Sequence, residues 1–197
     1  RSTLFPYTTL FRSNQRRLIR LAQTFVGHIK GGLAIVDVMV CAFFGAVSGS
    51  AVAATSAVGS IMIPSLKKEG YPADFSAGLT AVASTMAPVI PPSLAFVIYG
   101  AVSKVPIGDL FIAGILPGIL MAFALSALVY AYAKRDNYPS FPKTTWKERM
   151  RAIREAGPCL LLPVFILGGI ISGYFTPTEA SAMAALYARW LDRKSVV

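Results

Sequence analysis

The amino-acid sequence predicts an all-α, polytopic integral membrane protein. Hydrophobic residues make up 55% of the 197 residues, charged residues only 14%, and the mean hydropathy is +0.60. This composition is too apolar for a soluble domain of that length and is typical of a chain with several membrane spans. The formal net charge is +10, and the positive residues gather at the ends and in one central loop. Cytoplasmic loops are enriched in Lys and Arg, so this distribution indicates membrane topology and not a nucleic-acid partner.

The two ends of the chain, 1–13 and 191–197, are expected to be non-native flanks. The first of them has no regular hydrophobic period and resembles translated sequencing-adapter sequence, and the second is similar in kind. The transmembrane domain is therefore assigned to 14–190. Its first stretch, 14–30, is basic and amphipathic, which predicts a surface helix or the end of an earlier element on the cytoplasmic side.

The segment 31–66 predicts a re-entrant helical hairpin. It carries one charged residue, Asp37, and lies between Lys30 and Lys67. If both flanks are cytoplasmic, the segment must enter the membrane and return, and the small residues at 48–50 permit a tight turn. Two arms of about 15 residues would each rise ~22 Å, which is short of the ~30 Å hydrocarbon core. One long spanning helix with a Gly/Ser packing face is the alternative.

The next apolar segment, 75–100, predicts a membrane helix that is broken in the middle. Three prolines, Pro88, Pro91 and Pro92, interrupt it, and an α-helix cannot continue through them. The carbonyl groups freed by such a break must face protein, water or an ion. Secondary transporters build their substrate and ion sites at discontinuous helices.

Hydroxyl groups precede this break, and two roles are open for them. They could help coordinate a cation, or each could bond the carbonyl one turn back in its own helix. The residues concerned are Ser76, Thr80, Ser84 and Thr85.

The remaining predicted elements are a span over 110–133, a basic cytoplasmic loop over 134–155, a span over 157–175 and the start of another helix over 177–190. The loop carries seven Lys and Arg residues, which places it in the cytoplasm. Thr176 as N-cap and Glu179 three residues later form the capping-box pattern that predicts the last helix start.

No pattern in the chain predicts an enzyme. A Ser/His/Asp set, a P-loop and a GxGxxG sequence are all absent, and Cys41 and Cys159 have no CxxC spacing. The sequence therefore predicts no catalytic residues, no organic cofactor and no metal centre other than a cation held at the broken helix.

Six short sequences in a fixed order resemble those of the large membrane subunit of tripartite ATP-independent periplasmic (TRAP) transporters, the DctM-like permeases. The resemblance covers about 21–187 and rests on GGLA at 31–34, FGAVSGSA at 44–51, IP at 63–64, GY at 70–71, IPPS at 90–93 with YG at 99–100, and FTPTEA at 175–180.

The resemblance implies one inverted repeat of an elevator-type, sodium-coupled symporter, present here as a fragment of the N-terminal half. On that analogy the ion site comprises Ser48, Gly49, Ser50, Ser84, Thr85 and Pro88. The residues beside the substrate would be Pro91, Pro92, Ser93 and Thr55.

The resemblance also implies the setting of the transporter. It would lie in the bacterial inner membrane, work with a small membrane subunit, and receive an organic acid such as a C4-dicarboxylate or a sugar acid from a periplasmic binding protein. Two sites depart from the family pattern: Ala54 and Thr55 stand where many relatives carry an acidic residue, and Asp37 stands where an uncharged polar residue is expected. Asp37 could be functional or interfacial. The alternatives are another dicarboxylate/sodium symporter of the same superfamily and a membrane scaffold that transports nothing.

Overall fold

The computed structural model describes residues 17–136, 138, 144–176, 178–180, 182, 183 and 186, and all regular structure in this part is α-helical. This confirms the predicted all-α class. After a helix over 17–26, the elements are α2 (Gly32–Ser48), α3 (Ala51–Lys68), α4 (Ala73–Ser84), α5 (Leu94–Ser103), α6 (Ile107–Arg135) and α7 (Trp146–Ile171). The predicted flanks, 1–13 and 191–197, lie outside the described residues.

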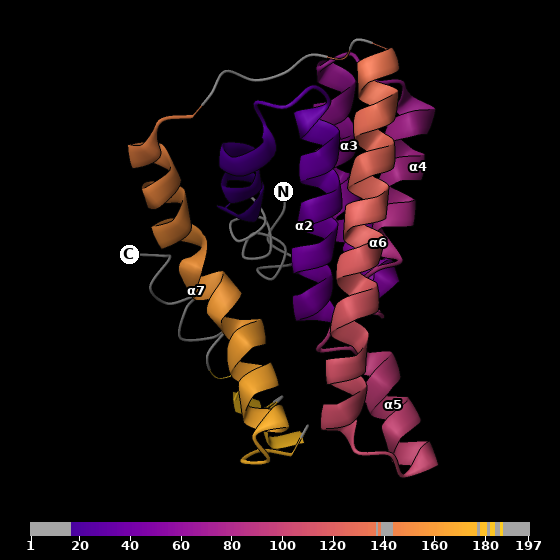
Figure 1. Ribbon diagram of the computed structural model, residues 1–197, viewed down its shortest axis with the longest axis vertical. Helices are drawn as coiled ribbons and strands as arrows, with labels where there is room; N and C mark the ends of the chain where they lie inside the picture. Colours follow the sequence, from indigo (N-terminus) through magenta and orange to yellow (C-terminus); the bar gives the residue numbers. More distant parts are fainter. Residues whose placement is uncertain are drawn as a thin grey trace, which may run out of the picture.

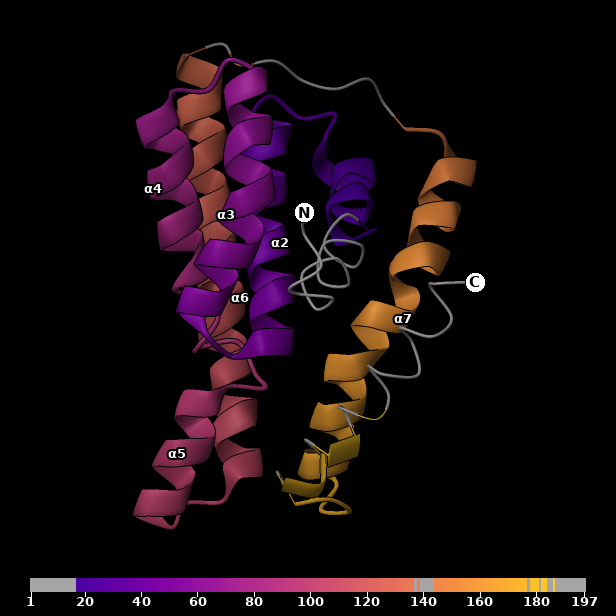
Figure 2. The same ribbon diagram turned by 180° about the vertical axis from the view of Figure 1, so that it is seen from behind.

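Helix α2 occupies the centre of a bundle. Figure 1 shows α2, α3, α4 and α6 side by side, with α5 beside the N-terminal half of α6. The largest cluster of buried apolar residues lies between α2 and its neighbours and includes Val36, Val58, Met62 and Val129. The view from behind shows the helix over 17–26 between the bundle and α7 (Figure 2). A second, smaller cluster of buried residues joins that helix to α7.

The segment predicted as a hairpin forms two helices, α2 and α3, and not one long helix. The turn lies at Gly49 and Ser50, where the sequence predicts it. Gly49 has a φ of 61°, a left-handed conformation that glycine adopts without a steric penalty. The two helices have 17 and 18 residues. Each therefore rises only about 26 Å at 1.5 Å per residue.

The start of α2 and the end of α3 lie at the same end of the bundle. Gly31 lies directly against Ala133 near the end of α6, and α3 and α6 both finish at that end with two basic residues (top of Figure 1). The basic residues are Lys67, Lys68, Lys134 and Arg135. Such a concentration of cations is expected on the cytoplasmic side of a membrane.

Aromatic side chains stack on one another at the end of the bundle that carries these basic residues. Tyr71, in the connection between α3 and α4, stacks on Tyr138 with a ring distance of 4.2 Å and on Phe75 with one of 6.0 Å. Burial raises the pKa of Tyr71 to about 12, so its hydroxyl stays neutral at physiological pH. Tyrosine side chains are enriched at membrane–water interfaces, which agrees with this position.

The proline-rich segment separates two helices. Helix α4 ends at Ser84, hydrogen-bonded turns follow, and α5 begins at Leu94. In those turns the Ala87 N–H donates to the Ser84 carbonyl at 3.0 Å and the Val89 N–H to the Met86 carbonyl at 2.9 Å. The break predicted in this segment is therefore present, between α4 and α5.

Helix α6 is, among the described residues, the one continuous helix long and apolar enough to cross a membrane. It contains the span predicted at 110–133. A second candidate is the pair Trp146–Pro158 and Leu160–Ile171 within α7, which is bent by 50°. Pro158 and Pro163 lie in α7 near this bend, and prolines of this kind are a common cause of helix kinks.

The prediction of a loop over 134–155 is wrong in its second half, because α7 begins at Trp146 and not near Gly157. The Thr145 N–H donates to the Glu148 carboxylate at 2.9 Å, which completes a capping box with the Thr145 side chain. The threonine and glutamate three positions apart were the sequence signal for this start. The span predicted over 157–175 belongs to this same helix, which ends at Ile171.

The predicted capping box at Thr176 is present. The Thr176 N–H donates to the Glu179 carboxylate at 2.8 Å, and the Glu179 N–H donates to the Thr176 hydroxyl at 3.3 Å. The hydrogen bond from the Thr176 N–H holds the pKa of Glu179 below its usual range. Residues 178–180 are helical, and most of the predicted helix over 177–190 lies outside the described residues.

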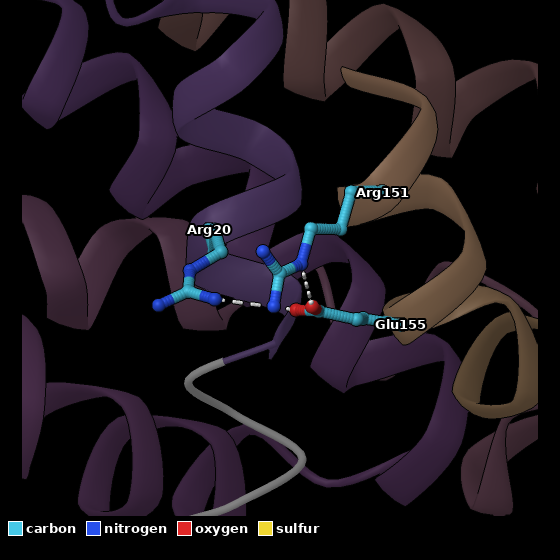
Figure 3. A network of polar contacts seen from close by, with 3 residues as sticks. All are labelled: Arg20, Arg151 and Glu155. Atoms are coloured by element: carbon cyan, nitrogen blue, oxygen red, sulfur yellow. Dashed lines mark hydrogen bonds and ion pairs between the residues drawn. The ribbon is translucent and has the colours of Figure 1, made fainter. Parts of the chain in front are cut away.

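A three-residue ionic contact joins the helix over 17–26 to α7. The Arg20 guanidinium lies 3.3 Å from the Glu155 carboxylate, and Arg151 donates to the same carboxylate at 2.9 Å (Figure 3). The hydrogen bond from Arg151 holds the pKa of Glu155 below its usual range. All three side chains are partly exposed, so the contact contributes little to stability.

Candidate functional site

The hairpin turn lies directly against the proline break. A Cβ atom on Gly49 would lie 2.9 Å from the backbone nitrogen of Leu94 and 3.2 Å from the carbonyl oxygen of Pro92. One turn earlier, a Cβ atom on Gly45 would lie 2.7 Å from the Cα atom of Ala87. These distances leave no room for a side chain. Glycine at both positions therefore lets the backbone of the hairpin touch the backbone of the break.

Two helix N-termini meet at this junction. Ser50 caps α3 by accepting a hydrogen bond from the Ala53 N–H at 3.4 Å, and Ser93 caps α5 by accepting one from the Phe96 N–H at 3.4 Å. Because Gly49 contacts Leu94, the first turns of the two helices lie close together. Helix N-termini carry partial positive charge and free N–H groups, so this pair can attract an anionic group.

The polar groups of the turn and the break also bond within their own segments. The Ser50 N–H donates to the Ser48 hydroxyl at 3.4 Å. On the other side of the junction, the Ser93 hydroxyl donates to the Pro88 carbonyl at 2.6 Å, which closes the break into a compact loop. Pro91 is buried in that loop, and its bond to Pro92 is cis.

The hydroxyls of the other predicted site residues form their contacts within the helices and not with the turn or the break. Thr85 is exposed and donates to the Val82 carbonyl at 2.7 Å. Ser84 is buried against α2, where its hydroxyl lies 3.6 Å from the Cys41 sulfur. Thr55 donates to the Ala51 carbonyl at 2.9 Å, one turn into α3.

The hydroxyls that precede the break all bond carbonyls three or four residues back in the chain. This is the second of the two roles that the sequence left open. The acceptors are the carbonyls of Pro72, Ser76, Thr80 and Val82, at 2.7 to 3.0 Å.

Asp37 is the residue whose surroundings the sequence did not settle, and the structure shows it inside the helix bundle. Its side chain is fully buried in the second turn of α2, with one carboxylate oxygen 2.8 Å from the Thr80 hydroxyl on α4. Cys41, one turn later, lies 3.9 Å from the other oxygen. The sequence signal was a matched spacing of four, with Asp37 and Cys41 on one helix and Thr80 and Ser84 on the other, which places each pair on one helix face.

Comparison with known proteins identifies a family. The family described as "Tripartite ATP-independent periplasmic transporter, DctM component" matches residues 12–192. A C4-dicarboxylate TRAP transporter large permease protein, DctM of Pseudomonas aeruginosa, is 46% identical over 176 residues, which cover 89% of this chain and 41% of the relative.

Relatives named for other solutes are equally similar. An ectoine/5-hydroxyectoine TRAP transporter large permease protein of Ruegeria pomeroyi is 47% identical over 176 residues, with 89% of this chain and 41% of the relative covered. A sialic acid TRAP transporter large permease protein of Vibrio cholerae is 43% identical over 175 residues, with the same coverage. The chain thus spans about two fifths of the length of these relatives. It belongs to the DctM family of TRAP transporter large permease proteins.

Proposed function

We propose that this chain forms part of the membrane permease of a sodium-coupled secondary transporter that takes up a small organic acid. The observation that carries the proposal is the contact of Gly49 in the hairpin turn with Pro92 and Leu94 in the proline break. It joins two interrupted helices, which is the arrangement from which secondary transporters build solute and ion sites.

The anionic group of the solute would lie beside the N-termini of α3 and α5. Both N-termini are capped by serine side chains, Ser50 and Ser93, whose hydrogen bonds are long at 3.4 Å. A carboxylate of the solute could replace these weak caps and accept stronger, charge-assisted hydrogen bonds from the same backbone N–H groups. Because the similar relatives are named for a dicarboxylate, an ectoine and a sialic acid, the proposed class is a carboxylate-bearing solute.

Sodium would bind at the opposite ends of the interrupted helices. Helix α2 ends at Ser48 and α4 at Ser84, and helix C-termini present carbonyl oxygens with partial negative charge. Ser48, Gly49 and Ser50 would supply oxygens from the turn, and Pro88 a carbonyl from the break. In this proposal α2 to α5 move together as the solute-carrying unit of an elevator-type carrier.

The partners would be a small membrane subunit in the bacterial inner membrane and a periplasmic binding protein that delivers the solute. The description of the family as tripartite supports this proposal.

Sodium-dependent protection of a single cysteine tests the ion site. Ser50→Cys would be made in a chimera in which residues 21–187 replace the matching part of the Pseudomonas aeruginosa permease, with the native cysteines of the chimera removed. Labelling by a maleimide would be followed in vesicles with sodium and with potassium. We expect sodium to slow labelling of this cysteine severalfold, while Ser60→Cys, exposed on α3, labels at the same rate in both salts.

Two results would contradict the proposal. If sodium leaves labelling at position 50 unchanged while the chimera takes up its solute, the ion site lies elsewhere. If the chimera inserts with the expected topology but catalyses no sodium-driven uptake, the segment acts only as a scaffold.

A further inference from the structure

A buried group of four polar side chains joins α2 to α4, away from the junction of the hairpin and the break. It consists of Asp37 and Cys41 on α2 and Thr80 and Ser84 on α4, and is called the Asp37 cluster below. All four side chains have a relative exposure of 0%. The function proposed above gives the carboxyl group of Asp37 no role.

The number of hydrogens available for hydrogen bonds in this cluster indicates the protonation state of Asp37. The Thr80 hydroxyl oxygen lies 2.8 Å from the Oδ2 atom of Asp37 and 3.0 Å from the carbonyl oxygen of Ser76. A hydroxyl group has one hydrogen and can donate to only one of these acceptors. With an ionised Asp37, which can only accept, one of the two short oxygen–oxygen contacts would lack a hydrogen. With a proton on Oδ2, Asp37 donates to Thr80 and Thr80 donates to Ser76, so both contacts are hydrogen bonds.

The second oxygen of Asp37 has little to stabilise a negative charge. Its neighbour is the Cys41 sulfur at 3.9 Å, and a thiol is a weak donor. The Ser84 hydroxyl is already engaged, because it donates to the Thr80 carbonyl at 2.7 Å. An ionised carboxylate here would therefore have one hydroxyl and one thiol as donors, which is poor compensation for a fully buried charge.

No cation lies within ion-pair distance of Asp37 in the part of the chain that the structure describes. Cys41 is the titratable group beside it, and α4 faces it with the uncharged Thr80. The charged side chains of the helices packed on α2 lie in terminal turns or in the first ten residues of α7. They are Arg17 and Arg20 on the helix over 17–26, Lys67 and Lys68 on α3, Asp74 on α4, Asp109, Lys134 and Arg135 on α6, and Lys147, Glu148, Arg149, Arg151, Arg154 and Glu155 on α7.

We propose that Asp37 is a proton-binding site, occupied at neutral pH, whose bound proton forms the hydrogen bond from α2 to Thr80 of α4. The ligand is a proton taken from water, which converts the carboxylate to the neutral acid without any other reactant. Release of the proton would place an unpaired negative charge between the two helices that carry the hairpin turn and the break. Proton occupancy is therefore linked to the contact between α2 and α4.

Infrared spectroscopy of the chain in lipid vesicles tests the protonation state directly. At about pH 7 we expect a carbonyl band of a neutral carboxylic acid that shifts in D₂O and is lost in Asp37→Asn. Asp74→Asn removes an exposed carboxylate on α4 and serves as the matched control, so it should leave that band unchanged. If the carboxylic-acid region of the wild-type spectrum matches that of Asp37→Asn, Asp37 is ionised and the proposal is wrong.

The pH dependence of stability gives a second readout. A group that folds with its proton bound contributes stability at low pH and loses it as the pH rises. The carboxyl group ionises in the unfolded chain at about pH 4, so we expect the unfolding midpoint of the wild type in mixed micelles to fall relative to that of Asp37→Asn as the pH rises from about 4 to about 7. The neutral amide of the variant can donate to Thr80 at every pH. A wild-type midpoint that rises with pH, with Asp37→Asn less stable throughout, would show that the carboxylate is the folded form.

Discussion

Helices α2 and α6 are similarly apolar but occupy opposite surroundings. Eleven of the 17 residues of α2 are buried, against five of the 29 residues of α6. The exposed side chains of α6 include Leu116, Ile119 and Phe123, at 69%, 62% and 73% exposure. In water such a surface would favour association, whereas in a bilayer it is the ordinary lipid-facing side of a helix. Hydropathy therefore finds both helices but does not tell which one lies inside the protein.

The difference also explains where the polar groups lie. Helix α2 has α3, α4 and α6 packed around it, so it can hold Asp37 beside the Thr80 hydroxyl. A carboxyl group on the exposed side of α6 would have to face hydrocarbon at a cost of several kcal/mol. A cluster such as that of Asp37 can therefore form only on a helix that is surrounded by other helices.

The largest expected effect tests this contrast on a single helix. Phe111 and Phe123 both lie on α6, with 0% and 73% exposure. Phe111→Ala should reduce the free energy of unfolding in mixed micelles by about 3 kcal/mol, at the low end for buried Phe because lipid lacks the water-transfer contribution. Phe123→Ala should change it by less than about 0.5 kcal/mol. Equal losses for the two variants would mean that the outer side of α6 is packed against protein.

The second prediction compares glycines of the inner and outer helices. In Gly45→Ala the new methyl group would lie 2.7 Å from the Ala87 backbone, and the backbone cannot yield as a side chain does. We expect a loss of about 2 kcal/mol in the free energy of unfolding. Gly168→Ala on α7 meets no atom within 4 Å and should be neutral or stabilising by up to about 1 kcal/mol. A tolerated Gly45→Ala would contradict the backbone contact at the junction.

A third, smaller effect concerns the break itself. Ser93→Ala removes the N-cap of α5 and the donor to the Pro88 carbonyl. The loss should be about 1 to 2 kcal/mol in urea or SDS titrations. Ser103→Ala, in the exposed last turn of the same helix, is the control and should change stability by less than about 0.5 kcal/mol. If both serines prove equally dispensable, Ser93 does not hold the break closed.

The smallest effect lies outside the bundle, at the contact of Glu155 with Arg20 and Arg151. Glu155→Gln should lower the unfolding midpoint slightly, and only at low salt, because these charges are exposed to solvent. The pKa of Glu155 is lowered in the folded protein, so its contribution is present above the usual carboxyl range and is lost as the pH falls. The difference from wild type should therefore vanish in acid. If the midpoints of Glu155→Gln and the wild type still differ in acid, the effect of the substitution comes from packing and not from charge.

The sequence predicted the interruptions of the helices well, since their causes are local. Glycine at 49 and the prolines at 88, 91 and 92 act on their own backbone, so the turn and the break lie where they were expected. The start of α7 differs from the prediction, because a high density of basic residues is compatible with a helix as well as a loop, and the local signal is the pair Thr145 and Glu148.

The parts of the site that depend on packing could not be predicted from the chain alone. Thr85 and Ser84 are neighbours, yet one is exposed and the other is buried against Cys41, and only the orientation of α4 on α2 decides this. The burial of Asp37 has the same cause. Whether Ser48, Gly49 and Ser50 bind sodium stays a prediction.

The glycine contacts at 45 and 49 also have a mechanical consequence. Two backbones in direct contact leave no side chains between them whose rotamers could absorb a displacement. In the proposed carrier, a displacement of the hairpin would therefore move the break with it, and the backbone would have to bend at the ends of the α2 to α5 unit. One such end is Lys104, the residue that follows α5. Its left-handed backbone conformation, with a φ of 59°, ends that helix before α6 begins.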